Sequence, residues 1–371
     1  MSFEICGRRI GRSQDVFVIA EIGLNHGGVL DRALALVDAA AWAGASAVKL
    51  QTLEASSLVA AQCPAPAHVS AGSMRDFFRT FELGWEAHRA VVQRAREHGL
   101  AVMTTPFCER VLTMLERLDL DAYKIASGDL TFDGLIAAAA RTGRPLILST
   151  GMSDLAEVTR ALRVAWTAGA HDVGILHCVS AYPTPVEAQN LRAITTLADA
   201  TDVPTGLSDH GSGLFAAIAA ATLGACIYER HLVLDDSDDA IDRAVSSTPR
   251  QLKAIVTALA ETKAALGDGV KRCLPAERAN VIPSRRGLYA TRPLPEGHTI
   301  TSTDVAVLRP ASELSPADLE WVLGATVARD VASGAPLVRP DLAPARAASL
   351  AITSVPDREG STFRPGIGVS A

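Results

Sequence analysis

Short apolar runs alternate with longer segments of helical periodicity from residue 17 to about residue 267. Eight of the runs have the length and composition of buried strands: FVIAEIG, AVKLQT, AVMTTPF, AYKIASG, PLILSTG, GILHCVS, TGLSDH and CIYERHL. The segments between them include DRALALVDAAAWAG, WEAHRAVVQRAREHG, LAEVTRALRVAWTAG and FAAIAAATLG, and a further helix, TPRQLKAIVTALAETKAALG, follows the last strand. Several of these helices end on glycine, a common helix stop. This alternation over about 250 residues predicts a (β/α)8 TIM barrel.

An open doubly wound α/β sheet is the alternative fold. It would usually show a glycine-rich phosphate loop after its first strand. Here the first turn reads GLNHGG, which fits neither of the common phosphate-binding motifs, so the closed barrel is favoured. The long irregular segment 53–84 follows the second strand and is expected at the carboxyl-terminal face of the barrel, where functional loops lie.

The chain changes character after the last helix. We predict a barrel domain over residues 1–270, a linker over 271–284, a small β-rich domain over 285–343 and a disordered tail over 344–371. The small domain contains a faint internal repeat, because ATRPLPEGHTITSTDV (290–305) matches ARDVASGAPLVRPDL (328–342). Four pairs fall at identical spacings: Arg292 and Arg329, Gly297 and Gly334, Ile300 and Leu337, and Asp304 and Asp341.

Composition narrows the range of partners. The 371 residues have a formal net charge of −6, which does not favour binding to nucleic acid. The amino terminus lacks an apolar signal core, and the apolar runs are shorter than the roughly 20 residues that span a bilayer. The six cysteines are scattered and form no C-x-x-C pair, so we expect free thiols in a reducing compartment. We expect a cytoplasmic protein with small-molecule substrates and neither nucleic-acid nor membrane partners.

Polar side chains stand at the carboxyl ends of all eight predicted strands. One serine, threonine or histidine there is ordinarily a satisfied buried group. Eight strands ending in this way indicate a shared site, because these ends meet at one face of a barrel. The residues are Glu21, Asn25, Lys49, Gln51, Thr104, Thr105, Lys124, Ser127, Ser149, Thr150, His177, Ser180, Ser208, His210, Glu229 and His231. Alternation places Lys49 with Gln51, Ser208 with His210, and Glu229 with His231 on shared faces.

His210 and His231 end consecutive strands, which lie about 4.8 Å apart in a sheet. Two imidazoles so placed can bind one divalent cation, with Mn²⁺ or Mg²⁺ preferred and Zn²⁺ also conceivable. His177 is expected to be structural. The remaining histidines are expected on the surface or in loops: His26, His68, His88, His98, His171 and His298.

Lys49 and Lys124 are costly to bury at strand ends without anionic partners. With Thr105, Ser127, Ser149, Ser180 and Ser208 they form a set that can bind a carboxylate and a phosphate. The alternative is a structural ion pair with Glu21 or Asp129. Glu21 and Asp242 are candidates for proton transfer, and most other carboxylates of the LDDSDDAID loop are expected to be solvated.

The chain resembles the sialic acid synthase (N-acetylneuraminate synthase) family. The ordered strings that match are IAEIGLNHGG, AVKLQT, TTPF, YKIASGD, ILSTGMS, HCVSAYPTP, GLSDH and ERH. The small domain resembles the antifreeze-like SAF domain that follows the barrel in that family, and the resemblance covers about residues 16–343. It implies condensation of phosphoenolpyruvate with the aldehyde of an N-acetylmannosamine-type sugar, which gives a nine-carbon 2-keto sugar acid and phosphate.

The resemblance also implies roles for individual residues. His210 and His231 would hold the metal, and Glu21 would assist proton transfer. Phosphoenolpyruvate would contact Lys49, Thr105, Lys124, Ser127, Ser149, Ser180 and Ser208, while Asp129 counts among the substrate-binding residues. The sugar would contact Gln51, Tyr182 and Asp242. In this family the small domain of one subunit covers the partner's barrel, which implies a domain-swapped homodimer and brings Arg309 to the N-acyl group.

Several positions depart from the family pattern. Some members have Asn at Ser180 and Glu at Asp129, the usual Gly-Pro before Asp242 is Ala240-Ile241, and Arg243 replaces a common His. A glycine-containing loop usually follows Arg309-Pro310, where this chain reads ASELSP. These departures leave the acceptor sugar open.

Three other functions stay open. They are condensation of phosphoenolpyruvate with a sugar phosphate, a metal-dependent amidohydrolase barrel and a non-catalytic sugar-binding barrel. The amidohydrolase is disfavoured because its first strand normally has His-x-His, where this strand reads AEIG.

Overall fold

The computed structural model describes residues 2–64 and 72–343. The chain divides into two compact units between Gly269 and Val270. The expected disordered tail, residues 344–371, and His68 lie outside the described residues.

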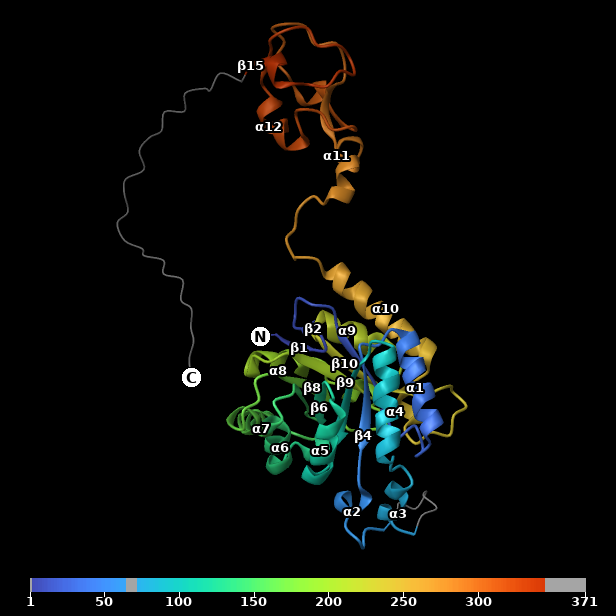
Figure 1. The fold of residues 1–371 in the computed structure, drawn as a ribbon. Helices are drawn as coiled ribbons and strands as arrows, with labels where there is room; N and C mark the ends of the chain where they lie inside the picture. The colour runs from blue at the N-terminus through green and yellow to red at the C-terminus, as the bar shows by residue number, and fades with distance from the viewer. Residues whose placement is uncertain (1, 65–71, 344–371) are drawn as a thin grey trace, which may run out of the picture. The chain divides into compact units, whose positions relative to one another are not determined.

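Parallel strands of the first unit close into a barrel (Figure 1). Each strand pairs with the next, and the last pairs with both its predecessor and the first, so the sheet has no open edge. The strands are β3 (Phe17–Gly23), β4 (Ala47–Thr52), β5 (Ala101–Pro106), β6 (Ala122–Ile125), β7 (Leu146–Ser149), β8 (Val173–Cys178), β9 (Thr205–Asp209) and β10 (Ile227–Leu232). Closure confirms the predicted (β/α)8 barrel and excludes the open sheet.

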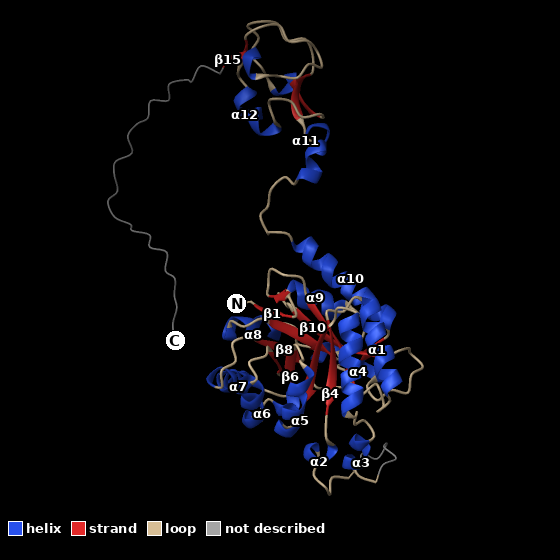
Figure 2. Cartoon of the chain, in the orientation of Figure 1, coloured by secondary structure: helices blue, strands red, loops and turns tan. Residues whose placement is uncertain are grey.

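Helices surround the barrel, as Figure 2 shows in blue around the red strands. They pack on it through apolar stripes; Ala33, Leu36, Val37 and Ala40 of the first helix are buried at helical spacing. That helix ends on Gly44, whose φ of 85° favours glycine. The helices are α1 (Leu30–Ala43), α4 (Trp85–Glu97), α5 (Glu109–Leu115), α6 (Asp133–Arg141), α7 (Leu155–Thr167), α8 (Ala193–Thr201), α9 (Phe215–Thr222) and α10 (Pro249–Leu266).

A short hairpin precedes the barrel and was not predicted from the sequence. It consists of β1 (Phe3–Ile5) and β2 (Arg8–Ile10), paired antiparallel. Phe3, Ile5 and Ile10 are buried in one cluster with inward-facing residues of the barrel strands. The hairpin therefore covers the amino-terminal end of the barrel and leaves the opposite end for the site.

The long connection after β4 contains α2 (Ala55–Leu58) and α3 (Met74–Arg79), which lie beyond the carboxyl end of that strand (Figure 1). This is the predicted position. The short strand β11 (Ser246–Ser247) pairs parallel with β10 after the loop that follows it.

One histidine differs from its sequence-based prediction. His26 and His88 were expected on the surface or in loops, and His26 does lie in the turn after β3, with its side chain buried. His88 is instead buried on α4. His88 contacts Thr52 at 2.9 Å, and Thr52 contacts Thr104 at 2.7 Å. Burial lowers the pKa of His26 to about 4, so its ring is neutral near pH 7. Thr52 of β4 supplies a polar partner that allows the His88 ring to be buried, whereas His26 Nδ1 accepts the backbone N–H of Gly28 in its own turn.

The second unit is built from two related halves. Its elements are α11 (Arg278–Ser284), β12 (Gly287–Ala290), β13 (Val305–Leu308), α12 (Leu319–Val322), β14 (Thr326–Val327) and β15 (Leu342–Ala343). β12 pairs with β13, and β14 pairs with β15, both antiparallel. The helix α11 occupies part of the segment that we predicted to be a linker.

The sequence repeat corresponds to a structural repeat. Arg292 Nε donates to Asp304 at 2.8 Å, and Arg329 makes the equivalent bond to Asp341. Leu294 and Val331 exchange two backbone hydrogen bonds of 2.8 Å, which join the halves. A duplicated unit is therefore confirmed, with an arginine–aspartate pair in each half.

Replacing Asp304 by asparagine is expected to lower the free energy of unfolding of this unit by about 2–4 kcal/mol, because its buried carboxylate also accepts from His298 and Thr301. These donors hold the pKa of Asp304 below its usual range. Its contribution is therefore present above the ordinary carboxyl pKa and is lost as the pH falls through the lowered value. Denaturant titration of the full chain, followed by hydrogen exchange in residues 287–308, measures the effect. Asp330→Asn, which affects one backbone bond to Glu296, is the control and should cost less.

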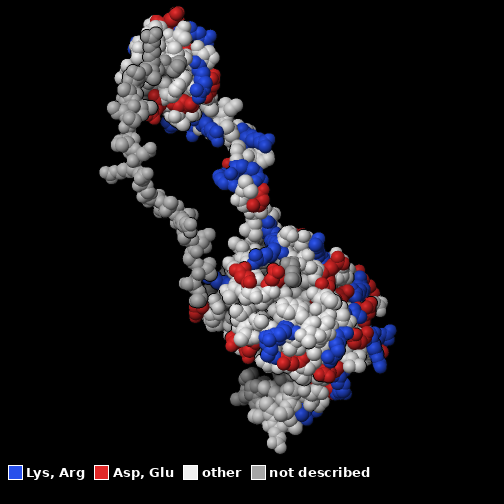
Figure 3. All heavy atoms as spheres, turned by 90° about the vertical axis from the view of Figure 1, so that its left-hand side faces the viewer, with Lys and Arg blue, Asp and Glu red and all other residues white. Residues whose placement is uncertain are grey.

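Charges of both signs are interspersed among the described residues on the face drawn in Figure 3. In the part of the chain that the structure describes, no helix has the length and apolar character needed to cross a membrane.

Candidate active site

A cavity of about 320 Å³ opens among the carboxyl ends of the barrel strands. It gathers most of the residues singled out from the sequence, from every strand of the barrel. Those that line it are Glu21, Lys49, Gln51, Thr105, Lys124, Ser127, Ser149, Ser180, Tyr182, Ser208, His210, Glu229 and His231. The pairs predicted to share a face therefore do so: Lys49 with Gln51 on β4, Ser208 with His210 at the end of β9, and Glu229 with His231 on β10.

The floor of the cavity is a buried cluster of two lysines and two glutamates. Lys49 forms an ion pair with Glu21 and lies 3.6 Å from Glu229. Lys124 Nζ lies 3.4 Å from the other oxygen of Glu229. All four side chains are at most 6% exposed, so each charge depends on these partners instead of water. The structural ion pair with Glu21 is present, whereas Asp129 pairs with neither lysine among the described contacts.

Burial shifts the proton equilibria of this cluster. Desolvation lowers the pKa of Lys49 to about 7, even though Glu229 opposes the shift. Burial alone would raise the pKa of Glu229, but the charges of Lys124 and Lys49 outweigh it and hold the carboxyl ionised. The floor thus offers one ammonium group, that of Lys49, whose charge is sensitive to pH near neutrality.

Hydroxyl groups surround the ammonium groups. Lys49 donates to Thr105 Oγ1 at 3.1 Å, and Ser208 donates to Glu229 at 2.9 Å. Ser127 Oγ accepts from the backbone N–H of Gly151 at 3.0 Å. A Cβ atom on Gly151 would lie 2.3 Å from Ser180 Oγ and 2.8 Å from Ser127 Oγ, so a larger residue could not stand there without displacing both hydroxyls. The glycine after β7 is therefore needed for these serines to converge.

Asp209, between Ser208 and His210, faces away from the cavity. It accepts a hydrogen bond from Tyr228 at 2.7 Å and forms an ion pair with Arg230 at 3.4 Å. At the end of β9, Ser208 and His210 therefore face the cavity, whereas Asp209 faces away from it.

His210 and His231 face each other across the cavity, with ring centres 5.6 Å apart. Burial keeps the pKa of His231 well below its usual range, so its ring is neutral, the form that binds metals. His231 Nδ1 is buried and has no hydrogen-bond partner among the described residues. His210 Nδ1 contacts the backbone oxygen of Val179 at 3.1 Å, which orients that ring.

These two rings fit a shared metal ion. An ion binds an imidazole nitrogen at about 2.0–2.1 Å, which puts two ring centres about 5 to 6 Å apart at a tetrahedral angle. Across the described residues, no group of three or more His, Cys, Asp or Glu side chains is arranged to hold a metal. The donors would therefore be these two imidazoles, with further positions left to water and substrate oxygens.

Three predicted site residues do not line the cavity. Asp242 borders it, with its carboxylate 3.5 Å from His231 Nδ1, and burial raises its pKa. Asp129 lies in the turn after β6, half-buried, and burial raises its pKa to about 6. Arg309 belongs to the second unit, so its role stays a prediction.

Other residues of the cavity were missed as site residues. Glu229 was recognised at its strand end but given no role, although it contacts both lysines. Cys178 and Met152 also line the cavity. For Glu229 the signal was present, since it alternates with His231. A role for Cys178 or Met152 had no comparable signal.

Buried polar atoms without partners are concentrated at the cavity. Nine side-chain atoms of the described residues are of this kind, and the four outside the cavity belong to His26, Arg32 and Gln189. The other five belong to residues that line it: Glu21 Oε1, Ser149 Oγ, Ser180 Oγ, Glu229 Oε2 and His231 Nδ1. Because buried polar atoms are nearly always satisfied, their concentration here indicates a site that binds a polar ligand.

A closed parallel barrel with acids, bases and hydroxyls gathered at its carboxyl end defines a TIM-barrel enzyme. The model of the NeuB family matches residues 36–271, and that of the SAF domain matches residues 285–343. The chain therefore belongs to the NeuB family, a family of nonulosonic acid synthases.

Relatives and solved structures agree with this assignment. The chain is 33% identical to the N,N'-diacetyllegionaminic acid synthase of Campylobacter jejuni, over 83% of this chain and 94% of that protein. It is 31% identical to a pseudaminic acid synthase of the same species, over 88% and 96% of the two chains. The crystal structure of N-acetylneuraminic acid synthetase from Leptospira borgpetersenii in complex with citrate is 31% identical and has a TM-score of 0.69, over 76% of this chain and 95% of that one.

Proposed function

We propose that the protein condenses phosphoenolpyruvate with the open-chain aldehyde of an N-acylated, mannosamine-type sugar. The products are a nine-carbon 2-keto sugar acid and inorganic phosphate. The observation that supports this most is the buried floor, where two ammonium groups and several hydroxyls surround unpartnered polar atoms. Such a floor suits a small ligand with both a carboxylate and a phosphate.

Phosphoenolpyruvate would bind at the floor. Lys49 and Lys124 would neutralise its charges, and hydroxyls would hold its oxygens, from Thr105, Ser127, Ser149, Ser180 and Ser208. The sugar would lie nearer the opening, against Gln51, Tyr182 and Asp242. Tyr182 is 56% exposed at the cavity and stacks on His210 with ring centres 4.3 Å apart, so its ring is available to a ligand.

The proposed reaction is balanced with one water molecule. C3 of phosphoenolpyruvate bonds to the aldehyde carbon, whose oxygen takes up a proton and becomes a hydroxyl. Water adds to C2, and the C2–O bond to phosphate breaks, which leaves the 2-keto group. Glu21 can hold or move a proton at Oε1, the oxygen that has no partner among the described residues. His210 and His231 would hold Mn²⁺ or Mg²⁺, with Zn²⁺ as the alternative, and the bound ion would polarise the aldehyde oxygen.

We further propose a homodimer in which the SAF domain of one subunit contributes Arg309 to the barrel of the other. This proposal rests on the family resemblance of both domains. The cytoplasmic location expected from the sequence also stays a prediction.

Phosphate release tests the proposed function. Purified protein with phosphoenolpyruvate and Mn²⁺ is expected to release phosphate only when an N-acylated aldehyde sugar is added. N-acetylmannosamine and a 2,4-diacetamido-trideoxy hexose should be compared, with a sugar phosphate as a third acceptor. Turnover with the sugar phosphate alone would favour the related condensing activity. Binding of sugar without turnover under any of these conditions would favour a sugar-binding barrel and overturn the proposal.

A further inference from the structure

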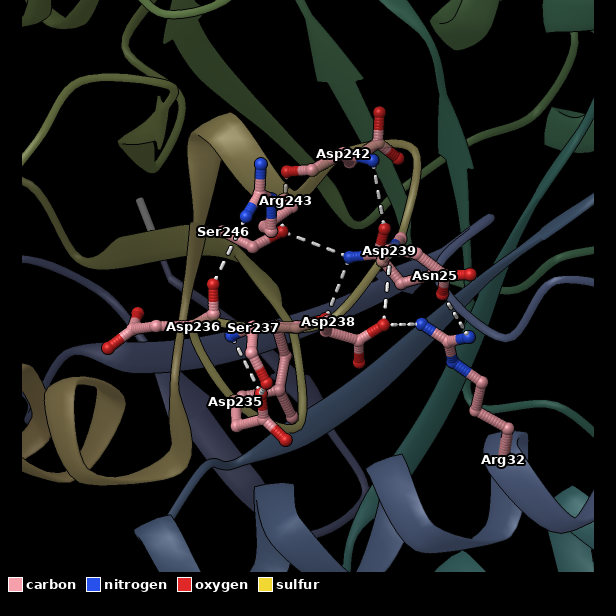
Figure 4. Close-up of polar contacts among 12 residues, drawn as sticks. Asn25, Arg32, Asp235, Asp236, Ser237, Asp238, Asp239, Asp242, Arg243 and Ser246 are labelled. Carbon is pink, nitrogen blue, oxygen red and sulfur yellow. Dashed lines mark hydrogen bonds and ion pairs between the residues drawn. The ribbon is translucent and has the colours of Figure 1, made fainter.

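The loop between β10 and β11 holds Asp242 next to the cavity, and it is anchored more firmly than its composition suggests. Most of its carboxylates were expected to be solvated. Asp238 is instead only 8% exposed, because it forms an ion pair with Arg32 of α1. The same guanidinium contacts Asp239 at 3.1 Å (Figure 4).

The Arg32 side chain is held in this contact by partial burial. Its side chain is 24% exposed, and Nε is buried with no hydrogen-bond partner among the described residues. Asp238 also accepts the backbone N–H of Ala240 at 3.1 Å, so the carboxylate joins Arg32 to the segment just before Asp242. This partly desolvated pair has more effect on loop position than an exposed surface pair would.

Asn25 forms a second anchor, at the other end of the loop (Figure 4). Its Oδ1 accepts the backbone N–H of Asp242 at 3.0 Å. Its Nδ2 donates to the backbone oxygen of Leu232 at 2.8 Å and to Ser246 Oγ at 2.9 Å. Ser246 Oγ in turn donates to the backbone oxygen of Asp242 at 2.7 Å. Both backbone polar groups of Asp242 are therefore held, directly or through one hydroxyl, by Asn25, which is 1% exposed.

Both anchors come from the segment that follows the first barrel strand, whereas the loop follows the last one. The two strands pair where the barrel closes, with Glu21 opposite His231. The anchors thus set the distance between the loop and the ends of both strands. At that position the Asp242 carboxylate lies 3.5 Å from His231 Nδ1.

We propose that Asn25 and Arg32 are positioning residues that hold this loop, residues 233–245, where Asp242 contacts the acceptor sugar. The inference rests on the proposed function. It makes the affinity for the acceptor sugar depend on two residues outside the cavity. The affinity for phosphoenolpyruvate should not depend on them, because that substrate is bound at the floor by other strands.

Arg32→Ala tests the proposal with two measurements. Hydrogen exchange of peptides covering residues 233–248 is expected to speed up at least about 10-fold, while peptides of β4 and β6 stay unchanged. In steady-state kinetics KM for the sugar is expected to rise about 10-fold, with kcat and KM for phosphoenolpyruvate within about twofold. Asn25→Ala should give the same pattern.

Matched variants separate positioning from a general loss of stability. Arg89→Ala removes an exposed ion pair with Glu86 on α4 and should change neither measurement. Arg32→Lys, which keeps the charge, should restore part of the sugar KM. The double variant Arg32→Asp with Asp238→Arg reverses both charges of the ion pair. Hydrogen exchange of its loop should be slower than in Arg32→Asp alone.

Two results would overturn the inference. One is loop exchange in Arg32→Ala and Asn25→Ala equal to that of the unaltered protein. The other is a fall in kcat with both KM values unchanged. Hydrogen exchange needs no turnover, so an inactive wild-type protein whose loop is loosened by Arg32→Ala would refute the proposed reaction while supporting the anchoring.

Discussion

His231→Ala is expected to lower kcat/KM by at least about 10³-fold while the fold stays intact. The ring lies at the end of β10, faces His210 with ring centres 5.6 Å apart, and has a buried nitrogen without a partner among the described residues. Alanine removes one of the two imidazoles proposed to hold the ion. Phosphate release at saturating Mn²⁺ measures the loss of activity, and metal content after gel filtration should fall from about one ion per chain.

His177→Ala is the matched control for this prediction. His177 is also buried near the end of a barrel strand, but its Nε2 contacts the backbone oxygen of Gln189 at 2.8 Å and it does not line the cavity. The His177→Ala variant should have a lower thermal stability but should keep most of its bound metal and most of its activity. If His231→Ala keeps both its metal and its turnover, the two-imidazole site is wrong.

Glu229→Gln is expected to weaken phosphoenolpyruvate binding by about 10²-fold and to destabilise the barrel by about 3–5 kcal/mol. The substitution keeps the size of the side chain but removes the charge that faces both lysines. The pKa of Lys49 is already lowered to about 7 by burial, and the charge of Glu229 is the main influence that raises it. Without that charge the ammonium group loses its proton at a still lower pH.

The pH dependence follows from the sign of this shift. An anionic ligand needs the protonated form of Lys49, so the affinity of the unaltered protein for phosphoenolpyruvate should fall as the pH rises above about 7. In Glu229→Gln the fall should begin at lower pH. Calorimetric titration with phosphoenolpyruvate between pH 6 and 8.5 measures both curves. The control is Glu116→Gln, which alters a contact to Tyr123 at 2.6 Å. Superimposable curves for Glu229→Gln and the unaltered protein would contradict the assigned role of the floor.

Much of the first unit could be read from local pattern. The runs FVIAEIG and AVKLQT correspond to β3 and β4 at both ends, and α4, α7, α9 and α10 begin within one residue of their predicted starts. Of these elements α4, α7 and α10 are long and periodic, whereas β3, β4 and α9 are short, largely buried apolar runs. The hairpin of β1 and β2 was missed because three-residue strands are too short to show alternation. Their apolar residues are recognisable only once the barrel end they cover exists.

The sequence predicted which residue types lie at the strand ends, but it predicted only some of the contacts between them. Alternation along a strand decides which side chains share a face, so Lys49 with Gln51 and Glu229 with His231 followed from the sequence. Lys124 and Glu229 are 105 residues apart, and nothing local to either shows that they meet. The same holds for Arg32 and Asp238, an ion pair between residues 206 positions apart, of which only the loop carboxylates had been considered and were expected to be mostly solvated.

The sequence by itself determined the barrel, the repeat in the small domain and the ring of polar residues at the strand ends, because each depends on a period or spacing along the chain. Only the tertiary structure decided which charges are desolvated and which partners compensate them, in the floor around Glu229 and in the anchored loop. The physical reason is that burial and ion pairing arise between elements distant in the chain, and their free energies depend on the water that the whole fold excludes.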